Sequence, residues 1–250
     1  MGTYKGLQGY RVESLASDPG TISEVIGKVW YNSGSNVWKV GVEGPGAWAA
    51  APTLNEARSS AGYSGTSNTS ALIFGGNTDY PFALPGETEQ YNGTSWTQVN
   101  AQQAARMNTG SNGTSTSALC WGGQTFTGGV PGLTPSVKNE EWNGTSWAEK
   151  ANIGANRNTC AGAGGPAAPT AALCIGGGPE PVGRTCVLWN GTSWTEVANI
   201  AVRATTTGGC SVSGTATMKI GGYSGPPEIY YNYTEEWADP VIGAKTITTS

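Results

Sequence analysis

The stretch EQYNGTSWTQV, residues 89–99, decides how this chain folds, because near copies of it occur twice more. The copies are EEWNGTSWAEK at residues 140–150 and VLWNGTSWTEV at residues 187–197. In each, an aromatic residue and a tryptophan flank the same string, Asn-Gly-Thr-Ser. Asn-Gly between two runs that carry aromatic residues predicts a β-hairpin with a type I′ turn, in which both central residues have positive φ.

Each hairpin belongs to a longer repeat of about 48 residues that occurs four times. A tryptophan is followed about ten residues later by an arginine, then by an apolar run that ends in Gly-Gly, and then by an acidic-aromatic segment. Repeats of this length indicate units that bury their apolar faces against neighbouring units. The tryptophans are Trp48, Trp96, Trp147 and Trp194, the arginines are Arg58, Arg106, Arg157 and Arg203, the glycine pairs begin at Gly75, Gly122, Gly176 and Gly221, and the hairpin aromatics are Tyr91, Trp142, Trp189 and Trp237.

One repeat contains four short segments that are typical of β-strands. In the first repeat we expect strands at 58–63, 70–75, 87–91 and 94–99, with SGTSN at 64–68 as a turn. Four antiparallel strands in each of four units predict an all-β fold, and a β-propeller more specifically, with a solenoid as the alternative. The last repeat lacks an NGTSW strand, so the segment GAWAAAP at 46–52 is expected to complete it and close the ring.

Composition excludes several classes of protein. Only 12% of the residues are charged and the net charge is -4, without any basic run, so we expect no nucleic-acid partner. No apolar stretch reaches the roughly 18–20 residues of a membrane span, which predicts no membrane insertion. The first 20 residues lack the apolar core of a secretory signal, so we expect synthesis in the cytoplasm without export. The ten tryptophans argue against a disordered chain.

The chain has five cysteines and no CxxC pair. Cys120 and Cys174 stand two residues before a Gly-Gly pair, where the other repeats have Ile73 and Lys219. A position shared with isoleucine favours a small buried side chain. We therefore expect free structural thiols, with a disulfide as the alternative.

Histidine is absent, which removes histidine-based catalytic triads and histidine-ligated metals. We expect no catalytic residue, no metal and no cofactor. Glu89, Glu140 and Glu235 share one repeat position, where the third repeat has Val187. The favoured interpretation is that they bind lysine, arginine or backbone N–H groups. The alternative is a glycosidase, which needs two carboxylates about 5–10 Å apart.

The loops after the Gly-Gly pairs vary in length and sequence, and they span 77–87, 124–138, 177–184 and 223–233. Variable loops on a rigid repeated scaffold are where binding usually occurs. Their aromatic residues suit stacking on a sugar or contact with a protein, although they could instead only cover the ends of the sheets. The candidate ligand-binding residues are Tyr80, Phe82, Phe126, Tyr223, Tyr230 and Tyr231.

From residue 46 to 237 the pattern resembles the kelch repeat. The resemblance implies a kelch-like β-propeller in which the four tryptophans pack between blades and the four arginines are buried among hydrogen bonds. Two features depart from the family. This chain has four clear repeats, whereas kelch rings more often have six or seven blades. Its fourth repeat reads MKIGG at 218–222, with Lys219 and no aromatic residue before the glycine pair.

The segment GKVWYNSGSNVWKV at 27–40 is similar to a short hairpin of bacteriophage structural and tail-fibre proteins, in which it can precede NGTSW-type repeats. This implies a non-enzymatic virion or tail-associated protein, with other virion proteins and a host glycan or receptor as partners. We expect residues 1–45 to form an attachment element or a fifth blade, paired with the tail at 238–250, and residues 46–250 to form the propeller. The alternatives are a carbohydrate-active enzyme and a cellular protein-interaction propeller.

Overall fold

The computed structural model describes residues 13–19, 28–41, 48–78, 83–126, 132–167, 169–179, 181–203, 205, 208–224 and 229–238. These residues form an all-β protein of several small sheets, and none of them lies in an α-helix. Contacts divide the chain into two units, Met1–Ala51 and Pro52–Ser250. Trp48, which the sequence places in the propeller, therefore belongs to the first unit.

The first unit contains a three-stranded sheet in the order β1-β2-β3, with β1 at Glu13–Leu15, β2 at Val29–Asn32 and β3 at Val37–Val40. β2 and β3 pair antiparallel, which confirms the hairpin expected within 27–40, and β1 runs parallel to β2. The Asp18 carboxylate accepts hydrogen bonds from Trp30 Nε1 at 3.1 Å and Asn32 Nδ2 at 2.7 Å. A fifth blade stays a prediction, and residues 239–250 of the tail lie outside the described residues.

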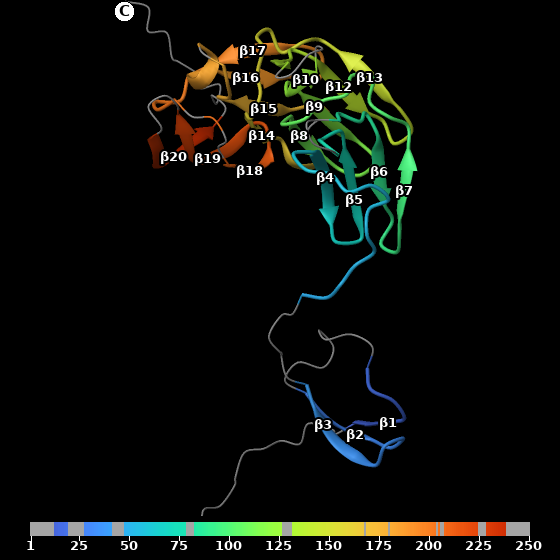
Figure 1. The fold of residues 1–250 in the computed structure, drawn as a ribbon. Coiled ribbons are helices and arrows are strands. Elements are labelled where there is room, and N and C mark those ends of the chain that lie inside the picture. Colours follow the sequence, from blue (N-terminus) through green and yellow to red (C-terminus); the bar gives the residue numbers. More distant parts are fainter. Residues whose placement is uncertain are drawn as a thin grey trace, which may run out of the picture. The chain divides into compact units, whose positions relative to one another are not determined.

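The second unit contains one sheet for each repeat (Figure 1). The first sheet comprises β4 (Gly62–Ser67), β5 (Ser70–Phe74), β6 (Thr88–Tyr91) and β7 (Trp96–Val99). The second comprises β8 (Gly110–Gly113), β9 (Ala118–Trp121), β12 (Asn139–Trp142) and β13 (Trp147–Lys150). The third comprises β14 (Ala161–Ala163), β15 (Ala172–Ile175), β16 (Cys186–Trp189) and β17 (Trp194–Val197). The fourth comprises β18 (Gly208–Ser213), β19 (Ala216–Ser224) and β20 (Ile229–Ala238).

Three shorter pieces connect the strands of these sheets. β10 and β11 form a small antiparallel hairpin between β9 and β12, and two 3₁₀ turns lie in the third repeat. Their bounds are Gln124–Phe126 for β10, Leu133–Pro135 for β11, Gly165–Ala167 for η1 and Val182–Arg184 for η2.

Neighbouring sheets touch through their first strands, in the order β4, β8, β14, β18. The Asn108 N–H donates to the Ser60 carbonyl at 2.9 Å, and the Thr159 N–H donates to the Asn108 carbonyl at 3.0 Å. All three residues have a left-handed φ of 51–54° and stand two positions after the repeat arginine. One backbone geometry therefore joins the first three sheets.

The Gly-Gly pairs allow this close approach. Gly75 and Gly122 have φ values of 60° and 62°, and a Cβ at these positions would lie 2.3 Å and 2.6 Å from the carbonyl oxygens of Arg106 and Arg157. The following N–H groups donate to the same carbonyls at 2.9 Å and 2.7 Å. Gly-Gly therefore supplies positive φ where the chain meets its neighbour.

Two repeat tryptophans pack between sheets, as the kelch resemblance implies. Trp147 of the second sheet meets Phe74 of the first edge-to-face at 4.7 Å, and its indole N–H donates to Thr88 Oγ1 at 2.9 Å. Trp194 of the third sheet packs against Trp121 of the second, with ring centroids 5.4 Å apart.

The other two repeat tryptophans do not have this role. Trp96 is half-buried and contacts Tyr91 of its own sheet at 5.1 Å. Trp48 is fully exposed, and residues 48–51 form no strand. The strand expected around Trp48 to complete the last sheet is therefore wrong, and the fourth sheet has three strands.

The strand expected at 58–63 is also placed too early. β4 begins at Gly62 and continues through the segment expected as a turn, so that the chain reverses at Asn68–Thr69. In residues 58–61 the Arg58 side chain donates a hydrogen bond to the Gly75 carbonyl, and Ser60 has a left-handed φ instead of an extended one. The segment 223–233, expected as a loop, is strand on both sides of residues 225–228.

The hairpins are correct, but their turns are not type I′. Tyr91 pairs with Trp96, so Asn92–Ser95 forms a four-residue loop in which only Gly93 has positive φ. The Asn92 carboxamide oxygen accepts hydrogen bonds from the Thr94 and Ser95 N–H groups, both at 2.9 Å. The asparagine side chain thus holds the loop, which removes the need for a left-handed asparagine.

Cys120, Cys160, Cys174 and Cys186 are buried free thiols, which confirms the expectation for Cys120 and Cys174. Burial raises the pKa of Cys186 to about 11. These thiols pack as small apolar side chains in the clusters between sheets.

Candidate functional site

The repeat arginines and glutamates form a buried framework. Arg106 donates to the carbonyls of Gly122 and Lys138 at 2.9 Å and 2.7 Å, and to Glu140 Oε1 at 2.7 Å. The Gln103 N–H donates to Glu140 Oε2 at 2.8 Å. This arginine ties a Gly-Gly strand end, a loop and a hairpin strand of one sheet together.

The first repeat has the same arrangement. Arg58 donates to the carbonyls of Gly75 and Glu87, both at 3.0 Å, and to Glu89 Oε1 at 2.8 Å. Asn55 donates to Glu89 Oε2 from its backbone and its side chain, at 2.8 Å and 2.9 Å. Burial works to raise the pKa of Glu89, but the bonds from Asn55 and Arg58 outweigh it and hold that pKa below its ordinary value.

The third and fourth repeats vary this framework. Arg157 donates to the carbonyls of Gly176 and Thr185, both at 2.9 Å, and to Thr185 Oγ1 at 2.6 Å, so a hydroxyl replaces the carboxylate. Glu235 accepts from the Ala201 N–H at 2.6 Å and lies 3.7 Å from the buried Lys219 Nζ. Arg203 is half-buried beside Gly183.

The three glutamates are therefore structural in position, as the favoured interpretation had it. Each is held by its own sheet or by the connection leading into it. No group of three or more Cys, Asp or Glu side chains suits a metal ion within the described part of the chain.

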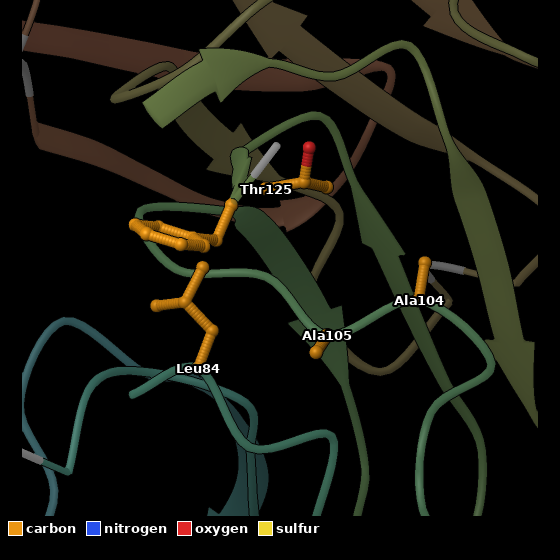
Figure 2. A pocket seen from close by; sticks show the side chains of 5 residues that line it. Leu84, Ala104, Ala105 and Thr125 are labelled. Atoms are coloured by element: carbon orange, nitrogen blue, oxygen red, sulfur yellow. The ribbon is translucent and has the colours of Figure 1, made fainter. Parts of the chain in front are cut away.

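One recess lies beside the β10–β11 hairpin, with a volume of about 400 Å³. Its lining is mostly apolar and consists of Leu84, Ala104, Ala105, Thr125 and Phe126. Figure 2 shows the Leu84 side chain on one side of the recess, Thr125 on the opposite side, and Ala104 and Ala105 along its edge. Phe126, a predicted ligand-binding residue, remains 42% exposed here. We call this site the Phe126 recess.

The end of the β19–β20 hairpin carries four tyrosines, which we call the tyrosine hairpin: Tyr223, Tyr230, Tyr231 and Tyr233. Tyr223 and Tyr230 face each other across the strands with ring centroids 5.3 Å apart. Tyr231 and Tyr233 stack along β20 at 5.9 Å, on the opposite side because neighbouring strand residues alternate. The Tyr231 hydroxyl lies 2.9 Å from Ser224 Oγ.

The structure brings together three of the six predicted ligand-binding residues, namely Tyr223, Tyr230 and Tyr231. Phe126 lies in the separate recess, and Tyr80 and Phe82 lie outside the described residues. Sequence reasoning missed Tyr233, although it lies in the same segment, 223–233, as the three tyrosines that were selected. The alternation Tyr-Asn-Tyr at 231–233 is a strand signal that could have identified it.

The described residues include no helix long and apolar enough to cross a membrane. No protein-family model matches the chain, and no curated protein matches it either.

Proposed function

We propose that this chain is a non-enzymatic structural protein of a bacteriophage virion, and that its tyrosine hairpin binds glycans of the host surface. The observation that carries the binding site is the set of four tyrosines on one hairpin, with Tyr230 77% exposed. Large exposed aromatic groups on a rigid support are typical of recognition surfaces, because little conformational entropy is lost on binding.

Sugar is the ligand class that this surface suits best. A tyrosine ring offers an apolar face to the C–H groups of a pyranose, and its hydroxyl can bind the hydroxyls around the ring. The pair Tyr223–Tyr230 and the pair Tyr231–Tyr233 lie on opposite sides of the hairpin, so two sugar units of one chain could contact it. The Phe126 recess, with the Thr125 hydroxyl beside an apolar wall, is a second and smaller contact point.

The scaffold in this proposal is a row of four kelch-like propeller blades. One sheet per repeat, first strands in succession, Trp147 and Trp194 between sheets, and buried arginines at one repeat position all support it. The virion assignment rests on the hairpin at 27–40 followed by NGTSW repeats, and the virion is the proposed location.

The carboxylates support a binding role over glycoside hydrolysis. A general acid needs a raised pKa, whereas the bonds to Glu89 lower its pKa. Glu140 is buried, and its two oxygens are bound by the Arg106 side chain and the Gln103 N–H, so neither is open to a substrate.

A glycan array with the purified protein tests the ligand. Changing all four hairpin tyrosines to alanine should abolish binding, Phe126→Ala should weaken it, and Trp38→Ala, an exposed aromatic of the first unit, should leave it intact. Binding that survives loss of the four tyrosines would overturn the assignment of the hairpin.

The virion assignment needs its own measurement. Peptides of this chain should be found by mass spectrometry in particles purified through a density gradient, in a fixed ratio to the other particle proteins. Recovery of the chain only from the lysate, with clean particles lacking it, would favour a cellular interaction propeller instead.

A further inference from the structure

The row of four sheets has two outer faces. On the first sheet Leu72 and Phe74 point toward the second sheet, so the alternate residues point away from it. We call the outward side the head face, formed by Tyr63, Ile73, Tyr91 and Trp96.

The opposite end of the row is the tail face. Trp237 packs on the third sheet, and Thr217 pairs with it and shares its side, so Met218 and Ile220 point away. The tail face is formed by Met218, Ile220, Thr234 and Glu236.

The tail face repeats the residue pattern of three buried interfaces. An apolar pair stands three and one positions before each Gly-Gly. The first three pairs are at most 2% exposed, whereas Ile220 in the fourth is 45% exposed. The three buried pairs are Leu72–Phe74, Leu119–Trp121 and Leu173–Ile175.

The head face carries the group that covers such pairs elsewhere. Trp147 covers Phe74, and Trp194 covers Trp121. Trp96 occupies the same repeat position on the first sheet but is half-buried, and Tyr63, on the strand at the other edge of the same face, is 74% exposed. The internal interfaces thus show what each outer face is built to contact.

We propose that the tail face of one molecule binds the head face of a second copy of this chain. Trp96 then packs on Met218 and Ile220 of the other copy, as Trp147 packs on Phe74. The Thr234 hydroxyl accepts the Trp96 indole N–H, as the equivalent Thr88 accepts that of Trp147. A second copy is the partner because one chain carries both halves of the repeated contact, the apolar pair on the tail face and the tryptophan on the head face.

The first strand of the head face differs at one position from those of the internal contacts. At the position of Tyr63 the second and third sheets have Ser111 and Gly162, which lie against the preceding sheet, and a Cβ at Gly162 would be 2.7 Å from the Ser111 carbonyl oxygen. The tail offers Gly208 and Gly209 at the start of β18. Because neither glycine has a side chain, the tail leaves room there for the larger Tyr63.

A head-to-tail contact is heterologous, so it leaves one head and one tail open and gives longer rows or a ring. None of the residues named for the two faces belongs to the tyrosine hairpin or to the Phe126 recess. It can therefore fail without affecting the proposed glycan binding, and the reverse also holds.

Sedimentation velocity over a wide concentration range tests the proposal. The wild-type protein should form species larger than a dimer. Ile220→Glu blocks the tail and Tyr63→Glu blocks the head, and each should weaken association by at least about 30-fold, the loss typical of an interface hot spot. Val37→Glu is the matched control, because Val37 is 44% exposed, like Ile220, but belongs to the sheet of the first unit and to neither face, and it should associate like wild type.

Mixing the two blocked variants is the decisive step. One variant keeps its head and the other keeps its tail, so an equimolar mixture should form a dimer and nothing larger. This dimer also shows that both variants fold. A wild-type protein that stays monomeric at every concentration would overturn the proposal, and so would a mixture that stays monomeric.

Discussion

A tryptophan occupies the same repeat position in two places, the contact between the first and second sheets and the head face of the first sheet. Its burial differs between the two. Trp147 is 4% exposed between two sheets, with its N–H bonded to Thr88. Trp96, at the same repeat position, is half-buried and contacts the ring of Tyr91. The repeat sequence sets the strand and the direction of the side chain, whereas the neighbouring sheet decides whether that side chain becomes core.

The largest expected effect concerns the buried ion pair. Arg106→Ala leaves Glu140 buried without its counterion and leaves two carbonyls without a donor, so the free energy of unfolding should fall by about 4–5 kcal/mol. Arg157→Ala is the matched variant, and it should cost only about 2–3 kcal/mol because its partner is a neutral hydroxyl. Urea unfolding followed by tryptophan fluorescence measures both. Equal losses would mean that the carboxylate adds nothing to this framework.

The tryptophans give the next largest difference. Trp147→Ala opens a cavity between two sheets and leaves Thr88 without its donor, so the loss should be about 3–4 kcal/mol. Trp96→Ala should cost about 1–2 kcal/mol, because that side chain is partly exposed and packs on Tyr91 of its own sheet. The measurement is the unfolding midpoint at low protein concentration, where association does not contribute. A loss at Trp96 as large as at Trp147 would show that the head face is covered within the single chain.

The local sequence pattern predicted the positions of strands better than it predicted which side chains are buried. The strand at 70–75 is confirmed by β5, because a short apolar run before Gly-Gly allows few other structures. The type I′ turn was wrong because the Asn92 side chain competes with the backbone for the Thr94 and Ser95 N–H groups. Whether a side chain is buried depends on contacts with residues that are tens of positions away in the sequence. The sequence alone therefore did not distinguish the half-buried Trp96 from the buried Trp147.

The candidate site shows the same limit. Tyr223, Tyr230 and Tyr231 were selected because they are aromatic residues in a variable segment, and the pairing of β19 with β20 then brings them together. Phe126 was chosen on the same ground but lies in another sheet, beside Leu84 from the preceding repeat. Composition identified the residue type, and strand register decided which of these residues can act together.

Two glycines of the repeated pairs allow the cost of a left-handed backbone to be measured apart from the cost of a steric clash. Gly122→Ala forces a left-handed alanine and places its Cβ against the Arg157 carbonyl, whereas Gly221→Ala meets only the strain, with its nearest atom 3.4 Å away. We expect losses of about 3 kcal/mol and about 1 kcal/mol respectively. Thermal unfolding of the two variants checks this. Similar losses would mean that the second sheet moves aside without cost at this contact.

The smallest effect depends on pH and tests the carboxylate of the first repeat. Because the pKa of Glu89 is lowered in the folded protein, its ionised form stabilises the fold above its ordinary pKa of 4.5, and this contribution is lost as the pH falls through the folded-state pKa. Glu89→Gln keeps the shape but removes the charge, so it should lower the free energy of unfolding at pH 7 by on the order of 1 kcal/mol. The difference between wild type and variant should shrink as both are acidified from pH 5. Urea titrations at several pH values measure it, and a difference that stays constant down to pH 2 would show that the charge of Glu89 does not stabilise the fold, and that Arg58 is held by its two carbonyl partners alone.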